Sequence, residues 1–118
     1  MSVHDNLVSQ LITHLVGDRF QNIKADLPEY DQPDAIWWTN KPDEKFIPDA
    51  TATKNDVPFI FEVETADSIG IDHSDAQWKV FAATAAKNSG HFCLYVEEGA
   101  EDAAKQRVQE LGITADVW

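Results

Sequence analysis

Apolar positions near the N-terminus recur at intervals of three and four residues. This pattern predicts a helix over residues 3–16, whose apolar face carries Leu7, Leu11, Ile12 and Leu15. Ser2, followed three residues later by Asp5, resembles a capping box at the start of this helix. Gly17 follows the last apolar position and is placed to end the helix.

The next segment has the two-residue period of a half-buried strand. Apolar and polar residues alternate over residues 22–27, which predicts a strand there. Residues 28–34 contain two prolines and are expected to form an irregular turn. The short apolar run at residues 35–38 predicts either an extra strand or a packed loop.

Two strand-like runs in the middle of the chain, residues 47–54 and 57–65, are separated only by Asn55 and Asp56. These two residue types tolerate the positive φ angles that a two-residue hairpin loop demands. The sequence therefore predicts an antiparallel hairpin.

The rest of the chain alternates helices and strands. The nearly continuous apolar run at residues 91–96 is typical of a buried parallel strand. Helices are expected over residues 75–87 and 100–111, and a last strand over residues 113–118. With the uncertain strand in brackets, the predicted order is αβ(β)ββαβαβ. This order indicates a single α/β domain with a mixed sheet flanked by helices.

The hairpin register predicts which side chains lie opposite one another. A two-residue loop pairs Lys54 with Val57, so Asp49 lies opposite Glu62. Strand side chains alternate between faces, so Glu64 lies on the same side of the sheet as Glu62, and the apolar residues between them point into a core. Three carboxylates are therefore expected within one small patch.

A cation would relieve the repulsion within such a patch. Like charges opposite each other on a sheet are destabilising, and partial burial increases the effect. Carboxylate oxygens suit a hard divalent ion, so the pattern predicts Mg²⁺ first, with Mn²⁺ or Ca²⁺ after it.

The residues around this patch resemble a known signature. Phe46-Ile47-Pro48-Asp49, then twelve intervening residues, then Glu62-Val63-Glu64, is similar to the motif of the PD-(D/E)XK nuclease superfamily. The core of that superfamily is a helix, a strand meander, a helix and a further strand, and the predicted element order is similar. The resemblance implies a restriction-endonuclease-like fold and a hydrolase that cleaves phosphodiester bonds of nucleic acid with Mg²⁺ or Mn²⁺.

The resemblance also implies roles for individual residues. Asp49 and Glu62 match the positions that hold the metal. The third motif position is usually lysine, and in this chain it is Glu64. Some type II restriction endonucleases carry glutamate there, where it is thought to bind metal or to take a proton from the attacking water. On that pattern Glu64 is a metal ligand and the general base.

The predicted helix over residues 75–87 offers two further candidates. Other members of the superfamily carry the lysine on this helix, for which Lys79 is the candidate. Exonuclease-like members have a Gln-x-x-x-Tyr motif there, and this chain has Gln77 with Phe81 in place of the tyrosine. The resemblance thus implies a substrate contact for Gln77.

Several of these positions also have a structural interpretation. Gln77 lies three residues after Ser74, which is a capping-box spacing, and Lys79 is also typical of a solvated helix residue. An acidic group on the first helix often completes such a site. His4 or Asp5 could serve, although a helix cap or a frayed terminus explains both better.

Composition places the chain among ordinary globular domains. It has 118 residues, of which 43% are hydrophobic and 25% charged. We expect neither a membrane span nor a secretory signal, because the apolar runs are too short and the N-terminus lacks a basic-then-apolar layout. Cys93 is the single cysteine, which suits a reducing, cytoplasmic location.

Charge bears on the expected partner. Nine Lys and Arg against 21 Asp and Glu give a net charge of −12, which repels the phosphate backbone of nucleic acid. Trp37 and Trp38 could stack on bases, although adjacent aromatics beside a proline-rich turn more often cover a core or a sheet edge.

The sequence therefore predicts a small metal-dependent nuclease-like domain with a nucleic-acid partner, and it leaves room for a homodimer. The alternative is a catalytically inactive domain of the same fold that acts as a binding or assembly module. The absent lysine and the negative charge favour this alternative. An unrelated metal-binding α/β protein is weaker, because it leaves the element order unexplained.

Overall fold

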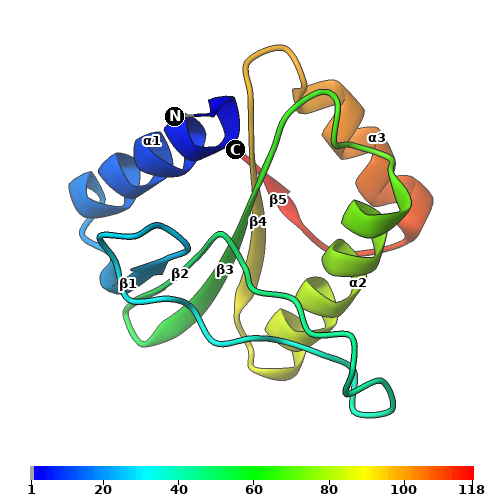
Figure 1. Ribbon diagram of the computed structural model, residues 1–118, viewed down its shortest axis with the longest axis horizontal. Coiled ribbons are helices and arrows are strands. Elements are labelled where there is room, and N and C mark those ends of the chain that lie inside the picture. The colour runs from blue at the N-terminus through cyan, green and yellow to red at the C-terminus, as the bar shows by residue number, and fades with distance from the viewer. Residues whose placement is uncertain (1) are drawn as a thin grey trace.

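The computed structural model describes residues 2–118, and helices cover both faces of a central sheet (Figure 1). The elements in chain order are α1 (Val3–Gly17), β1 (Gln21–Ala25), β2 (Ala50–Lys54), β3 (Val57–Glu64), α2 (Asp72–Lys87), β4 (His91–Val96), α3 (Glu101–Leu111) and β5 (Asp116–Val117). The α/β class and the mixed sheet agree with the hydrophobic pattern, and the order is the predicted one without its bracketed strand.

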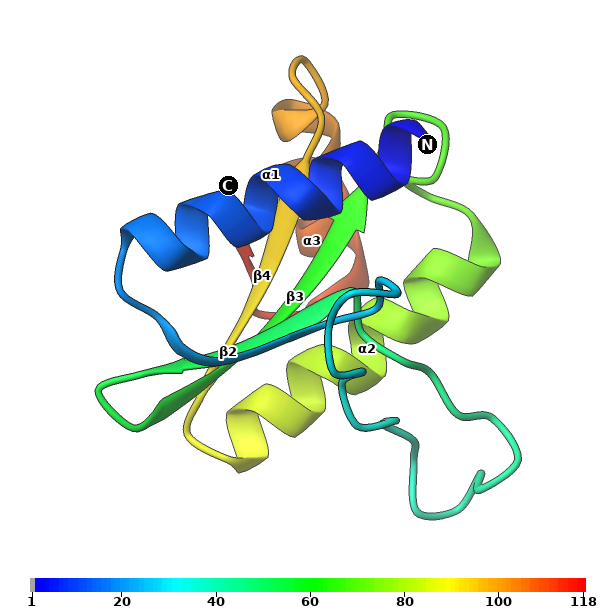
Figure 2. The ribbon, with the colours of Figure 1, turned by 60° about the vertical axis from the view of Figure 1, so that its left-hand side comes forward.

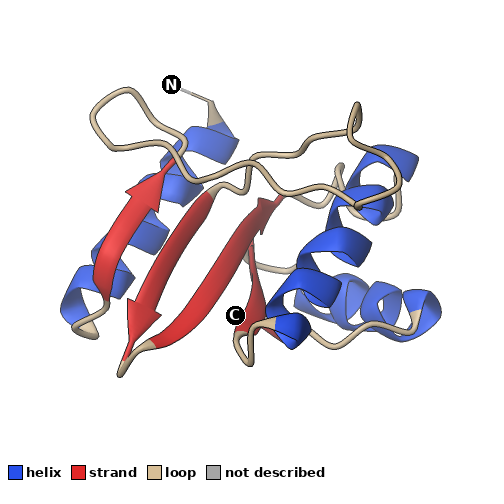
Figure 3. Cartoon of the chain, turned by 90° about the horizontal axis from the view of Figure 1, so that it is seen from below, coloured by secondary structure: helices blue, strands red, loops and turns tan. Residues whose placement is uncertain are grey.

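The strands are arranged in the sheet in the order β1-β2-β3-β4-β5. β1, β2 and β3 are antiparallel neighbours, whereas β3, β4 and β5 run parallel. Parallel neighbours need a crossover connection, which α2 and α3 supply. Both crossover helices lie on one face of the sheet and α1 lies on the other (Figure 3).

Successive side chains of β3 point to opposite faces of the sheet, and this divides the hydrophobic interior into two cores. Phe61 and Val63 pack with Leu11 of α1 on one face. Ile60 packs with Trp78 of α2 on the opposite face. This division confirms that the even-numbered residues of β3, which include both glutamates, share the face covered by α2.

The hairpin between β2 and β3 has the predicted register. Asn55 and Asp56 take φ angles of 52° and 66°, and Lys54 pairs with Val57. Ala50 pairs with Phe61, so the next position outward brings Asp49 opposite Glu62. Local turn chemistry thus determines the pairing that the site depends on.

The predicted start of α2 is wrong by three residues. The helix begins at Asp72 rather than residue 75, and its N-cap residue, Ile71, makes no side-chain capping hydrogen bond. Ser74 is a buried residue inside the helix. The capping box of Ser74 and Gln77 is therefore wrong, because tertiary packing of the first turn replaces a side-chain cap.

The short apolar run at residues 35–38 does not form a strand of the sheet. Ile36 makes an isolated antiparallel bridge with Phe46, and both pack against the core beneath α2. This contact makes residues 26–49 a long segment that returns on itself beside α2 (Figure 2). None of the helices in the described part of the chain is both long and apolar enough to cross a membrane.

Candidate functional site

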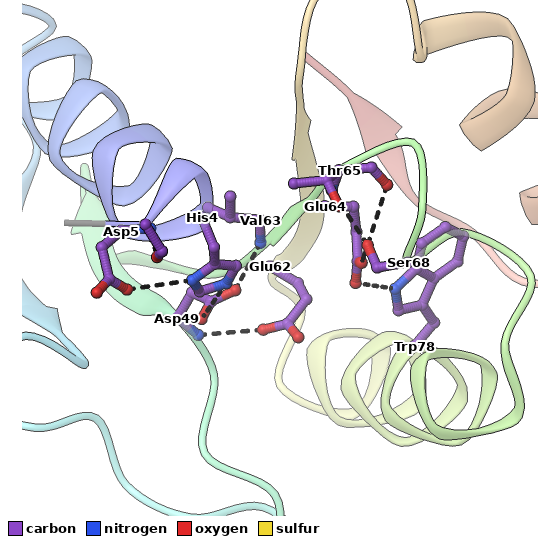
Figure 4. Close-up of polar contacts among 10 residues, drawn as sticks. His4, Asp5, Asp49, Glu62, Val63, Glu64, Thr65, Ser68 and Trp78 are labelled. Atoms are coloured by element: carbon purple, nitrogen blue, oxygen red, sulfur yellow. Dashed lines mark hydrogen bonds and ion pairs between the residues drawn. The ribbon is translucent and has the colours of Figure 1, made fainter.

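Asp49 and Glu62 form a buried cross-strand pair where β2 begins (Figure 4). They are 7% and 5% exposed. The Asp49 backbone N–H donates to Glu62 Oε1 at 3.1 Å, and the Val63 N–H donates to Asp49 Oδ2 at 2.7 Å. Backbone donors of both strands therefore fix the two carboxylates side by side.

Glu64 lies on the same face, but its carboxylate turns toward α2. Its Oε1 accepts a hydrogen bond from the Trp78 indole at 2.8 Å, and its Oε2 accepts one from the Ser68 hydroxyl. The residue is 3% exposed. Glu64 therefore lies next to the Asp49–Glu62 pair without converging on the same point (Figure 4).

His4 brings a positive charge to the pair from the first turn of α1. Its Nε2 lies 3.1 Å from Asp49 Oδ1. The next residue, Asp5, also contacts the His4 ring, with its Oδ1 3.4 Å from His4 Nδ1. The Asp5 backbone N–H donates to the Ser2 hydroxyl at 3.0 Å. Ser2 therefore caps α1 as predicted. His4 contacts the carboxylate pair, so it is more than part of a helix terminus.

The electrostatics of the patch are those of crowded acids. Burial raises the pKa of Glu62 well above its usual value, and the nearby charges of Asp49 and Glu64 add to the effect. Burial also raises the pKa of Glu64, although the hydrogen bonds from Ser68 and Trp78 oppose the rise. A bound cation would lower the free energy of the ionised patch.

The His4–Asp49 contact makes stability depend on pH. The hydrogen bond that His4 donates to Asp49 is the largest influence, and together with the nearby acids it raises the His4 pKa from 6.5 to about 9. Because the folded pKa is the higher one, the stabilisation is complete below about pH 6.5 and is lost as the pH rises through about 9. We expect His4→Gln to reduce the free energy of unfolding at low pH and to have little effect above about pH 9. Denaturant titrations across this range measure the difference.

The partner residue provides the control for this prediction. In an Asp49→Asn background, His4→Gln should no longer produce a difference in stability that varies with pH. A difference between the wild type and His4→Gln that stays constant over the whole range would contradict the ion pair.

The Asp49–Glu62 pair fits a divalent ion whose remaining ligands come from water and substrate rather than from protein. Mg²⁺ is often held by one or two carboxylates with water and substrate phosphate completing its shell. Asp49 and Glu62 provide two such carboxylates, and Glu62 Oε2 is used by none of the contacts above. A site made entirely by protein is not present, because residues 2–118 contain no group of three or more His, Cys, Asp or Glu able to hold a metal.

The two candidates on α2 lie on different sides of that helix. Gln77 is half-buried and precedes Thr84 by two turns, so both lie on the side of α2 that turns toward β2. Lys79 is exposed and lines a shallow hollow with Asp72 and Asp75. Gln77 therefore lies on the side of α2 that faces the sheet. Lys79 lies on another side of the helix, and the structure does not bring it to the carboxylates.

The main omissions of sequence reasoning concern partners distant in the chain. Trp78 and Ser68 hold Glu64, and neither carries a sequence signal for that role. Trp37 and Trp38 are 44% and 38% exposed, so neither belongs to the buried core. The high polarity of the neighbouring residues could have indicated that the two tryptophans are exposed, because a polar segment offers little apolar surface for them to pack on.

Comparisons with known proteins add no family to this geometry. No protein-family model matches the chain, and the searches of curated proteins and of solved structures return no significant match.

Proposed function

We propose that this domain hydrolyses phosphodiester bonds of nucleic acid with the help of Mg²⁺ or Mn²⁺ held by Asp49 and Glu62. The observation that carries the proposal is the buried cross-strand pair of carboxylates, oriented by backbone N–H groups of both strands. The order of elements around the pair is similar to that of the PD-(D/E)XK superfamily, which supports the same chemistry.

Each residue of the site would have its own role in hydrolysis. A bound divalent ion would polarise a phosphoryl oxygen and lower the pKa of a bound water. Asp49 and Glu62 would position that ion through oxygens that backbone N–H groups already orient. Glu64, with its pKa raised by burial, would accept the proton of the attacking water. His4 would supply the positive charge that lysine supplies elsewhere in the superfamily.

An inactive binding or assembly module is the second candidate, and a specific observation favours it. Both oxygens of Glu64 accept hydrogen bonds from the protein itself, as expected for a structural carboxylate. A cleavage screen separates the two candidates. Purified protein is incubated at low ionic strength with single-stranded and duplex DNA and RNA, in Mg²⁺, in Mn²⁺ and in chelator. Metal-dependent cleavage supports the nuclease, and its absence in every combination supports the binding module.

We expect Glu64→Gln to abolish metal-dependent cleavage while preserving the fold. An amide cannot accept the proton of water near neutral pH, so the rate should fall by about 10²-fold or more. Glutamine fits the same place, because its carbonyl can accept from Trp78 and its amide can donate to the Ser68 hydroxyl. Initial rates and thermal melts of the two proteins measure both effects.

Lys79→Ala is the matched variant on the following helix. Lys79 is exposed and lies beside Asp72 and Asp75, so its removal should change the rate by less than about twofold. The reverse result, with Lys79→Ala damaging and Glu64→Gln mild, would show that lysine performs the role on α2 and that Glu64 is not the base.

The proposal includes a partner and a location. Nucleic acid is the substrate, and a second copy of the chain would enlarge the surface that grips it. Cys93 is fully buried, and burial raises the pKa of its thiol to about 12, which suits a reduced structural cysteine in the cytoplasm.

A further inference from the structure

A groove lies on the same face of the sheet as the carboxylate pair. Its floor includes Thr51 of β2 and Ile60 of β3, which pair across the two strands, and its volume is about 330 Å³. Asp49 and Glu62 occupy the next position on the same face, about 7 Å further along the strands. The groove therefore ends one residue pair away from the carboxylates, on the same face of the sheet.

The lining of the groove is mostly apolar, with a few polar and charged side chains along its walls. Thr84 of α2 and Asn88, which follows the helix, lie on one side, and Lys24 and Asn22 of β1 lie on the other. Thr84, Asn88 and Ile36 also line a second hollow that adjoins the groove and contains Trp37 and Lys87. The two hollows form one continuous surface, here called the Trp37 groove.

The charge of the Trp37 groove differs from that of the whole chain. Lys24 and Lys87 line it, and Lys45 lies over the Trp37 ring with its Nζ 4.7 Å from the ring centroid. Asp34 is the only acidic residue among the described residues that line it. Two lysines and one acid thus line the groove, with Lys45 next to Trp37, on a chain of net charge −12.

The neighbouring hollow provides the contrast. Trp38 lines a separate hollow whose charged residues are two lysines, Lys41 and Lys79, and three acids, Glu44, Asp72 and Asp75. The two tryptophans are adjacent in sequence and similarly exposed, but only Trp37 lies in basic surroundings.

We infer that the Trp37 groove binds a single strand of nucleic acid and leads it to Asp49 and Glu62. This inference rests on the proposed function and specifies its substrate. An exposed aromatic ring beside lysines is the arrangement that stacks on an unpaired base while the cations contact its phosphates. A duplex buries its base faces and carries twice the phosphate density, so it gains nothing from Trp37 and is repelled more strongly by the acidic surface.

Binding is measured in chelator, so that cleavage plays no part. Fluorescence polarisation follows a labelled 12-nucleotide single strand, as DNA and as RNA, and the corresponding DNA duplex at low ionic strength. We expect the single strand to bind at least about tenfold more tightly than the duplex. Equal or tighter binding of the duplex would overturn the inference, and so would a failure of every oligonucleotide to bind.

Two pairs of variants locate the binding surface. Trp37→Ala should weaken single-strand binding about tenfold, whereas Trp38→Ala should change it less than about twofold. Lys87→Ala should weaken binding and flatten the dependence of log Kd on log salt by about 0.7, whereas Lys105→Ala on α3 should leave that slope unchanged. Equal losses from Trp37→Ala and Trp38→Ala would show that the groove is not the binding surface.

The outcomes distinguish this inference from the proposed function. Single-strand binding that depends on Trp37, without cleavage in any metal, would support the groove and refute the nuclease. Metal-dependent cleavage of duplex and single strand at equal rates would support the nuclease and overturn the groove.

Discussion

Asp49→Asn should lower the rate of Mg²⁺-dependent cleavage by roughly 10³-fold. Removing one of two metal-holding carboxylates forfeits several kcal/mol of charge stabilisation in the transition state, and each 1.36 kcal/mol is tenfold in rate. The substitution keeps the shape of the side chain, so its oxygen can still accept the hydrogen bond from the Val63 N–H. Single-turnover rates of both proteins measure the change.

The same variant should lose the response of stability to metal. At about a hundred times its dissociation constant, Mg²⁺ bound to the native state alone stabilises it by about 2.7 kcal/mol. Thermal melts with Mg²⁺ and with chelator should therefore differ for the wild type and coincide for Asp49→Asn. Glu62→Gln should weaken the response as well, because it removes the charge of the second carboxylate.

Asp56→Asn is the matched control for both measurements. It removes an equal charge from the exposed tip of the hairpin, and asparagine tolerates the φ of 66° found there. Cleavage and metal response should both remain at the wild-type level. If Asp49→Asn retains either property as Asp56→Asn does, Asp49 is not a metal ligand.

Trp78→Ala should have the largest effect on stability, a loss of about 3–5 kcal/mol. The indole is fully buried in the core between α2 and the sheet, and it also donates to Glu64. The substitution leaves a large cavity and a buried carboxylate without its donor. Such a loss corresponds to a Tm lower by roughly 12–20 °C for a domain of this size, which a thermal melt detects.

Trp78→Phe separates the two contributions. It retains most of the buried ring and removes the N–H, so it should cost about 1–3 kcal/mol for the unpaired Glu64 oxygen. Lys79→Ala, one residue further along α2 and exposed, should change stability by less than about 0.5 kcal/mol. A Trp78→Ala variant that melts within a few degrees of the wild type would show that Trp78 contributes little to the stability of this core.

The carboxylate pair could be predicted because its geometry depends on local chemistry. Asn55 and Asp56 determine the loop length, and the loop length determines the register that brings Asp49 opposite Glu62. The period of two then determines that Glu64 shares their face. No distant residue takes part in these steps.

The start of α2 could not be predicted in the same way. Ser74 and Gln77 have the spacing of a capping box, yet the helix extends to Asp72 and buries Ser74. A capping signal describes one way to satisfy the first N–H groups, and packing of the first turn against the rest of the protein can outweigh it.

The sequence by itself determined the order of the elements, the two faces of β3 and the pairing of Asp49 with Glu62. Each depends on periodicity or turn geometry within a few residues. The tertiary structure alone decided that His4 contacts Asp49, that Trp78 and Ser68 turn Glu64 toward α2, and that Trp37 lies beside a basic groove. These contacts join distant residues, such as His4 and Asp49, which are 45 positions apart. Side chains so distant meet only when α1, α2 and the 26–49 segment pack on the sheet, and local periodicity carries no information about which of their polar groups then become neighbours.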